Sequence, residues 1–244
     1  MIPIRDDCSG SRLPIISLSV MALSVAVFAL ELHWSANGEL GEVWQSWGFV
    51  GARFWGSLGE VLQDGNLAAA VAWLLFSLPS LWTSLFLHAS FSQLLGNLLF
   101  LWVFAPRVEA FWGRGCFLAF YLGCGGLTYG IQAIFVDPSV STPLVGSNGA
   151  IAAILGAYLI LFPTAKIDSL CLWGMGWIPV QLPAGFYGIW WFVQQVFYGI
   201  GRLSAEVTVN SWSVGYWAHG LGLLVGGGLA LWAKHQLSMA SSED

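Results

Sequence analysis

Six polar side chains stand out because they lie within or beside long apolar segments. They are His88, Gln93, Asn97, Ser147, Asn148 and His219. Polar and ionisable groups are costly inside a membrane and are treated as functional candidates by default. Together they can make a catalytic site, a hydrogen-bonded clamp or a water-filled pocket. The stretch Gly146-Ser147-Asn148-Gly149 matters most, because it depends on the role of Ser147 and Asn148 there whether the chain is an enzyme.

The composition is that of a polytopic membrane protein. Of the 244 residues, 57% are hydrophobic and only 9% are charged, and the mean hydropathy is +0.73. Soluble domains carry about 25% charged residues. Fifteen Trp and sixteen Phe are typical of aromatic belts at membrane interfaces. A net charge of −5 with scattered basic residues excludes a nucleic-acid-binding stripe, and no motif for a metal or cofactor is present.

Six apolar segments are expected to span the membrane, which makes the predicted fold an all-α bundle. They are 13–34, 92–105 with flanks from His88 to Val108, 115–136, 148–163, 183–200 and 212–233. The run 66–89 is a seventh candidate. With six spans, six Lys and Arg residues share the side of the termini against two on the other side, whereas seven spans give three against five. The positive-inside rule therefore favours six spans with both termini cytoplasmic.

This topology divides the chain into three parts. We expect a cytoplasmic N-terminus over 1–12, a single membrane domain over 13–236 and a cytoplasmic tail over 237–244. The first outer loop, about 35–87, is large and amphipathic. Its apolar residues at helical spacing are Trp44, Trp47, Phe54, Trp55, Leu58 and Leu62. The loop either lies on the outer membrane surface, as its tryptophans favour, or is a packed loop helix without a membrane role.

The same topology brings the polar residues to one depth. The second, fourth and sixth spans all enter from the outer side, so His88, Asn148 and His219 fall in the outer third of the bilayer. Gln93 and Asn97 are four residues apart and share a helix face. Small residues that allow close helix contact recur in the fourth and sixth spans, at Gly149, Gly156, Gly222 and Gly226. We expect these two spans to pack tightly, and to pack on each other.

Three blocks in this order resemble the rhomboid family of intramembrane serine proteases. They are TSLFLHASFSQLLGNLLFLWVFAPRVEAFWG (Thr83–Gly113), VGSNGAIAAILGAYLILFP and YWAHGLGLLVGG. The resemblance covers residues 80–235 and implies a six-helix rhomboid-like bundle. It also implies a multi-pass protein of a bacterial cytoplasmic or organellar inner membrane.

The resemblance assigns roles to individual residues. His219 matches the family's histidine base, and Asn97 matches the asparagine that stabilises the oxyanion, with Gln93 and His88 beside it. Asn148 stands where the family has its nucleophilic serine. A carboxamide has no hydroxyl to activate, and removing the nucleophile of a soluble serine protease costs about 10⁶ in kcat.

Ser147 is the alternative nucleophile, but it is one residue early, which is about 100° of rotation on a helix. Gly149 and Gly156 fit the family pattern without a shift of register. Another reading gives Ser147 or Asn148 only a helix-capping role, since both residue types are favoured N-caps. Asn148 is also a candidate to hydrogen-bond His219 across the helices.

These residues predict a rhomboid-like protein that does not cleave. Its expected partners are the lipid bilayer and transmembrane helices of client proteins, or other subunits of a larger membrane complex. The alternatives are an active protease that uses Ser147 with His219, and a nucleophile-substituted variant of an active protease. A channel or transporter is a further alternative, although the sequence shows no repeated halves.

Overall fold

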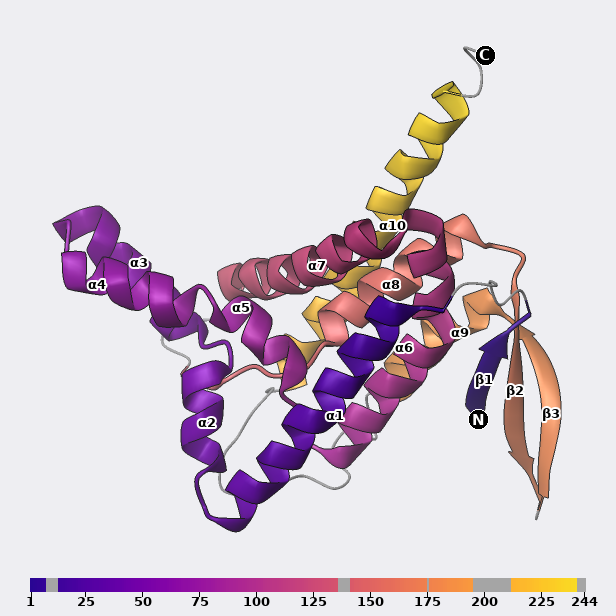
Figure 1. Cartoon of the computed structure of the whole chain (residues 1–244), viewed down its shortest axis with the longest axis horizontal. Helices are drawn as coiled ribbons and strands as arrows, with labels where there is room; N and C mark the ends of the chain where they lie inside the picture. The colour runs from indigo at the N-terminus through magenta and orange to yellow at the C-terminus, as the bar shows by residue number, and fades with distance from the viewer. Residues whose placement is uncertain (8–12, 136–140, 175, 195–211, 241–244) are drawn as a thin grey trace.

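A computed structural model describes residues 1–7, 13–135, 141–174, 176–194 and 212–240 of the chain (Figure 1). Its helices are α1 (Ile15–Ala36), α2 (Leu40–Trp47), α3 (Gly51–Asp64), α4 (Leu67–Ala72), η1 (Trp73–Ser77), α5 (Ser80–Thr83), η2 (Ser84–Phe86), α6 (Phe91–Trp112), α7 (Arg114–Phe135), α8 (Asn148–Leu161), α9 (Ala184–Gln194) and α10 (Trp212–Ala240). Its strands are β1 (Ile2–Asp6), β2 (Lys166–Trp173) and β3 (Gly176–Pro183).

Helix α8 lies at the centre of the bundle and contacts α6, α7, α9 and α10. All of its residues from Gly149 to Tyr158 are buried. The helix can be buried all round because it is apolar all round. The stretch Gly146-Ser147-Asn148-Gly149 lies at its N-terminal end.

Glycines lie where α8 meets α10. A Cβ atom on Gly226 would overlap the Ala153 carbonyl, and one on Gly222 would overlap the Gly149 carbonyl. One on Gly156 would overlap the backbone of Leu223. Since Gly222 faces Gly149 and Gly226 faces Ala153, the two helices run in the same direction in close contact. Gly149 also faces α7, where a Cβ would overlap the Thr128 side chain.

The contact between α8 and α10 predicts opposite effects on stability when Gly226 and Gly228 are replaced by alanine. Gly226→Ala should lower the free energy of unfolding by about 1–3 kcal/mol, because the methyl group overpacks a backbone contact. Gly228→Ala is the matched control, since a Cβ there meets nothing within 4 Å. It should be neutral or slightly stabilising, because alanine favours the helix over glycine. Thermal unfolding in detergent measures both, and equal effects would contradict the close approach of α8 and α10.

Within the part of the chain that the structure describes, four helical segments are long and apolar enough to cross a membrane: Ile15–Ala36, Leu67–Phe86, Phe91–Trp112 and Arg114–Ile134. The shorter helix α8 is apolar as well. The chain is therefore a multi-pass membrane protein. The six-span topology stays a prediction, because part of the predicted fifth span, 195–200, lies outside the described residues. The run around 67–86 is long enough to span but consists of α4, the π-helical η1, α5 and the 3₁₀-helical η2.

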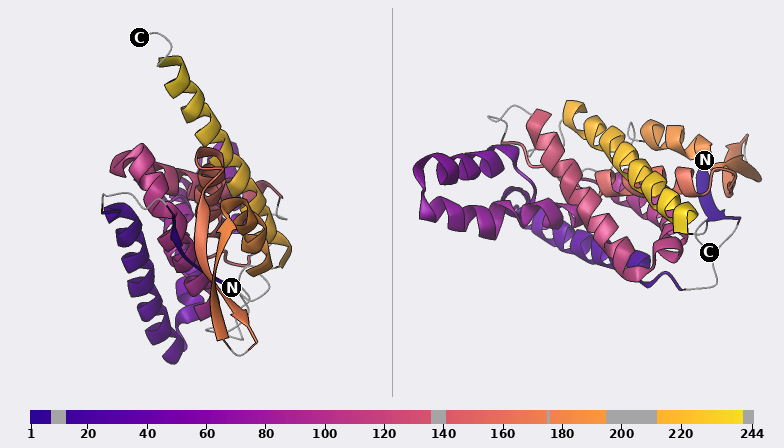
Figure 2. Two further views of the ribbon diagram at one scale, coloured as in Figure 1. Left: turned by 90° about the vertical axis from the view of Figure 1, so that its right-hand side faces the viewer. Right: turned by 90° about the horizontal axis from the view of Figure 1, so that it is seen from above.

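The predicted first outer loop is mostly helical. Figures 1 and 2 show α3 and α4 as an arm that extends from the bundle, at the end opposite the β-strands. Trp47 and Leu62 are exposed, as lipid-facing side chains would be. Trp44 is 1% exposed, and its indole N–H donates to Glu31 of α1 at 2.8 Å. Trp44 therefore packs inside the bundle and does not lie on the membrane surface, because this hydrogen bond holds its ring against α1.

The chain is mostly helical, as predicted, but it is not all-α, because it also forms a three-stranded sheet in the order β1-β2-β3. The strands are antiparallel, with Asp6 opposite Ile167 and Ile2 opposite Leu170. Residues 164–182 lie between the predicted fourth and fifth spans, where the sequence analysis expects no strand. Gly174, with φ of +59°, lies in the turn between β2 and β3, and such a glycine between apolar runs is a hairpin signal.

The two chain ends also carry more regular structure than expected. Strand β1 lies within the predicted N-terminal segment 1–12 and joins the sheet. Helix α10 continues to Ala240, so it includes the first residues of the predicted tail 237–244. In Figure 1 this end of α10 projects beyond the other helices.

Candidate functional site

Asn97 is the centre of a buried group of polar side chains. It lies on α6 one turn after Gln93, and each is 1% exposed. Its Nδ2 atom lies 3.2 Å from Nε2 of His88 and 3.1 Å from the hydroxyl of Ser147. The amide therefore joins the loop before α6 to the start of α8.

His88 is fully buried between η2 and α6. Its Nδ1 atom lies 3.1 Å from the Phe86 carbonyl oxygen. Because a carbonyl can only accept a hydrogen bond, Nδ1 carries the proton, and Nε2 is left to accept from Asn97. The imidazole is thus neutral and serves as a hydrogen-bonded link between the loop and α6.

Glu31 supports this loop from α1, and the sequence analysis missed it. The carboxylate accepts the backbone N–H of His88 at 3.0 and 3.1 Å and the indole N–H of Trp44 at 2.8 Å. Glu31 is 0% exposed. A lone acidic residue in an apolar segment was the available signal, because such residues are rare in transmembrane helices and usually have a partner.

Gln93 fixes the segment that leads into α8. Its Oε1 atom accepts the Ala89 N–H at 2.8 Å, and its Nε2 atom donates to the Val145 carbonyl at 3.1 Å. Gly146 follows with φ of +114°, and a Cβ atom there would overlap Nε2 of Gln93. The chain therefore needs glycine at this turn, both for its backbone conformation and for the space that the Gln93 amide occupies.

Ser147 points to α6. It is fully buried and occupies the N-cap position of α8, but its side chain makes no capping hydrogen bond. The capping interpretation is wrong for this side chain, because its hydroxyl is the acceptor for Asn97 instead. Only its backbone carbonyl takes part in the first turn, by accepting the Ile151 N–H at 2.9 Å.

Asn148 is the first residue of α8 and is partly exposed. Its Oδ1 atom is buried without a hydrogen-bond partner among the described residues. Among the described residues, no hydrogen bond joins Asn148 to His219, to α6 or to α10. The carboxamide lies at the first residue of the helix.

His219 lies on α10, one turn before Gly222, the glycine that packs against Gly149 of α8. The ring is 2% exposed, and its centroid lies 5.7 Å from that of Trp191 on α9, in an edge-to-face arrangement. Since the Gly149–Gly222 contact sets the level of the two helices, His219 lies near the start of α8. No motif or spacing in the sequence predicts that Trp191 lies beside His219.

The structure thus brings His88, Gln93, Asn97 and Ser147 into one connected group. His219 lies on the neighbouring helix α10, near the level at which α8 begins. The arrangement offers buried amide donors beside a helix start and a histidine across from it. Both amide hydrogens of Asn97 are donated to His88 and Ser147, so this amide can hold an oxyanion or a peptide carbonyl only by giving up one of those bonds.

Comparisons with known proteins agree with the geometry. The family model for the Rhomboid domain matches residues 75–235, more than half of the chain. A putative rhomboid protease, YdcA, of Bacillus subtilis (strain 168) is 33% identical over 116 residues, which cover 38% of this chain and 57% of the relative. The mitochondrial presenilin-associated rhomboid-like protein A of Danio rerio is 30% identical over 90 residues, which cover 36% of this chain and 24% of the relative.

The alignments span little more than half of the first relative and about a quarter of the second. The matched region of the family nevertheless holds α6, α8 and α10, the helices on which the candidate site is built. The chain belongs to the rhomboid family.

Proposed function

We propose that this protein is a rhomboid that binds transmembrane helices without cleaving them. The observation that carries the proposal is the direction of the Ser147 hydroxyl at the helix start, which is buried and hydrogen-bonded to Asn97 of α6. The position where the family resemblance places the nucleophile holds the carboxamide of Asn148. A carboxamide has no hydroxyl from which a histidine could take a proton.

The register of α8 supports this assignment. Gly149 packs against Thr128 and Gly222, and Gly156 packs against Leu223. A shift by one residue would replace each of these glycines with a larger residue at a backbone contact. Ser147 therefore cannot move into the position of Asn148 without disrupting the contact between α8 and α10.

The remaining parts of the site are suited to binding. The amides of Asn97 and Gln93 are held in place by the contacts described above, and the surrounding helices form a membrane-embedded scaffold. We infer that the clients are membrane proteins, or that the chain is a subunit of a larger membrane complex. The expected location is a bacterial cytoplasmic or organellar inner membrane with both termini cytoplasmic.

A serine-directed fluorophosphonate probe tests the proposal on the full chain in detergent and in lipid vesicles. The unmodified protein should remain unlabelled, because the Ser147 hydroxyl is engaged with Asn97, and Ser147→Ala should give the same result, because it lacks that hydroxyl altogether. A catalytically active rhomboid treated in parallel shows that the probe works. Labelling of the unmodified protein that Ser147→Ala abolishes would instead establish an active protease that uses Ser147 with His219.

Ser147→Ala also has an expected effect on stability. It removes the acceptor for one amide N–H of Asn97 and should lower the free energy of unfolding by about 1–3 kcal/mol. Thermal unfolding in detergent checks the value. A neutral substitution would show that the hydrogen bond from Asn97 to Ser147 contributes little.

A further inference from the structure

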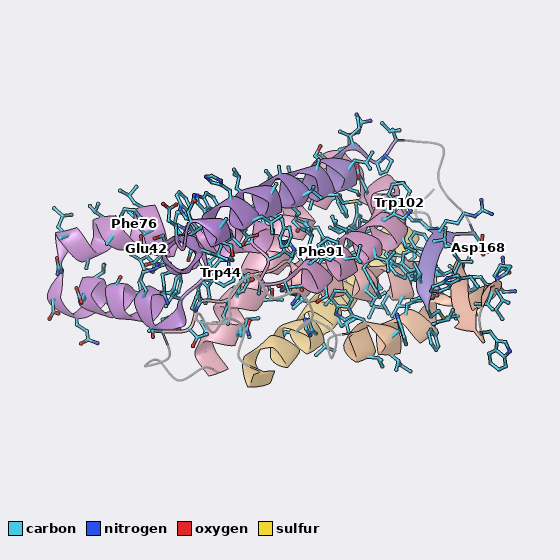
Figure 3. The ribbon with its side chains drawn as sticks, turned by 90° about the horizontal axis from the view of Figure 1, so that it is seen from below. Glu42, Trp44, Phe76, Phe91, Trp102 and Asp168 are labelled. Atoms are coloured by element: carbon cyan, nitrogen blue, oxygen red, sulfur yellow. The ribbon has the colours of Figure 1, made fainter. Side chains whose placement is uncertain are left out.

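The three-stranded sheet is attached to α6 through its first strand. The Nη1 atom of Arg107 on α6 donates to both carboxylate oxygens of Asp6, at 2.9 and 3.0 Å. The indole N–H of Trp102 on α6 donates to the carbonyl of Ile4 at 3.1 Å. Figure 3 labels Trp102 on α6 and Asp168 on β2 at this end of the molecule. Strand β1 is therefore held against α6 at two points along the helix.

The ion pair between Asp6 and Arg107 is the stronger of the two attachments, because its hydrogen bonds join charged groups. The Asp6 side chain is 5% exposed and that of Arg107 is 21% exposed, so solvent screens the pair little. The Cζ atom of Arg107 also lies 4.1 Å from the ring centroid of Phe162, at the end of α8. The loss of Asp6 would leave Arg107 without its nearest counter-ion.

The same sheet is attached to α9. Strand β2 pairs with β1, with Ile167 opposite Asp6, and β3 leads directly into α9, which begins at Ala184. The hydroxyls of Ser169 on β2 and Tyr187 on α9 are hydrogen-bonded, and both side chains are buried. The sheet thus joins two helices: α6 holds β1, β1 pairs with β2, and β2 holds α9.

Aromatic rings connect α6 and α9 inside the bundle. The ring centroid of Trp191 on α9 lies 4.6 Å from that of Phe100 on α6, and the centroid of Tyr187 lies 5.8 Å from that of Phe104. Trp191 is also the ring that packs edge-to-face on His219 of α10. Helices that meet through side-chain rings keep their backbone hydrogen bonds to themselves. The position of α9 against α6 therefore also depends on how the first turns of α9 are held.

We propose that the sheet β1-β2-β3 is a strap: through the Asp6–Arg107 pair, it holds α9 against α6 and keeps Trp191 packed on His219. Breaking the pair would allow β2, β3 and α9 to move together, because Ser169 and Tyr187 stay joined. A continuous series of hydrogen bonds and packed rings of this kind can couple distant parts of a protein. The strap is independent of whether the site cleaves, so it can be tested without a substrate.

The reactivity of the histidines toward diethyl pyrocarbonate tests the strap on the full chain in detergent. The reagent modifies accessible imidazoles, and mass spectrometry gives the modified fraction at each histidine. His219 is 2% exposed and should react slowly in the unmodified protein. The exposed His235, near the end of α10, gives the rate for an accessible side chain. His88, which is buried outside the strap, reports any general loosening of the bundle.

Asp6→Ala should raise the modification rate of His219 about tenfold relative to His235, as expected for the loss of charge-assisted hydrogen bonds that hold β1. The rate at His88 should change little. Asp6→Glu keeps the carboxylate and should retain most of the protection. If Asp6→Ala does not fold, Arg107→Gln breaks the same pair from the other side and should have the same effect.

Arg5→Gln is the matched control. It removes the neighbouring ion pair, in which Arg5 of β1 lies 2.8 Å from Asp168 of β2. This pair lies within the sheet and does not involve α6, so His219 should stay protected. Tyr187→Phe keeps the aromatic ring but removes the hydrogen bond to Ser169 at the other end of the strap, and it should expose His219 as well.

An unchanged rate at His219 when the Asp6–Arg107 pair is broken would overturn the strap. An equal rise at His88 and His219 would also overturn it, because the whole bundle would then have loosened. The same holds if Arg5→Gln exposes His219 as much as Asp6→Ala does, since the docking of β1 on α6 would then play no special part. Continued protection of His219 in Tyr187→Phe would show that β2 does not hold α9, and would overturn the strap at that end.

Discussion

Asn148→Ser is expected to give this chain a reactive serine. The new hydroxyl would stand at the first residue of α8, beside the buried donors of α6 and at the level of His219 on α10. A histidine base can take its proton, and the amides can stabilise the oxyanion that follows. Loss of the nucleophile costs a soluble serine protease about 10⁶ in kcat, so restoration should raise cleavage of a transmembrane substrate by several orders of magnitude.

The measurement is fluorophosphonate labelling of Asn148→Ser, followed by cleavage of a labelled transmembrane peptide in detergent. Asn148→Ala is the control for the substitution itself and should remain inert. In the Asn148→Ser background, His219→Ala should abolish labelling, whereas Ser147→Ala should leave it measurable. An Asn148→Ser protein that is monodisperse and unlabelled would contradict the assignment of this position as the place of the nucleophile.

The outcome also separates two explanations for the lack of reactivity in the unmodified chain. If Asn148→Ser alone reacts, the scaffold is intact and one reacting atom is missing. If His219 is dispensable for that reaction, the site does not operate as a serine–histidine pair. Both results can be obtained without knowing the natural client.

The residue pattern was sufficient to predict the family, the shared helix face of Gln93 and Asn97, and the contact between the fourth and sixth spans. Gln93 and Asn97 share a face because α6 is a helix, and the glycines of α8 and α10 lie where the two helices meet. Both features follow from helical periodicity, which is a local property of the sequence. Local patterns of this kind are read directly from the order of residues.

The features that the sequence analysis missed depend on contacts between distant segments. Strand β1 pairs with β2, which lies about 160 residues later in the sequence. The residues next to each strand therefore do not reveal the pairing. The Ser147 side chain contacts Asn97 and does not cap α8, and its direction depends on the backbone conformation at Gly146, whose φ is +114°. Trp44 is buried because Glu31 lies within reach on another helix. In each case a partner far along the chain decides the outcome.

Glu31→Leu is expected to be strongly destabilising. Glu31 of α1 holds the Trp44 indole N–H and the His88 backbone N–H, both in buried surroundings. Each buried donor left without an acceptor costs about 1–3 kcal/mol, so the loss of both should lower the free energy of unfolding by about 2–6 kcal/mol. Glu31→Gln keeps a side-chain oxygen and should retain a large part of this stability.

Glu42→Leu provides the comparison, because Glu42 is an exposed acid in the first turn of α2. Its loss should cost less than about 1 kcal/mol, the usual contribution of an acid near a helix N-terminus. Thermal unfolding in detergent gives the three values. Since Glu31 holds the loop that carries His88, Glu31→Leu should also suppress probe labelling in the Asn148→Ser background, at temperatures where the protein is still folded. Full labelling of a destabilised Glu31→Leu protein would show that Glu31 supports the fold but does not position the site.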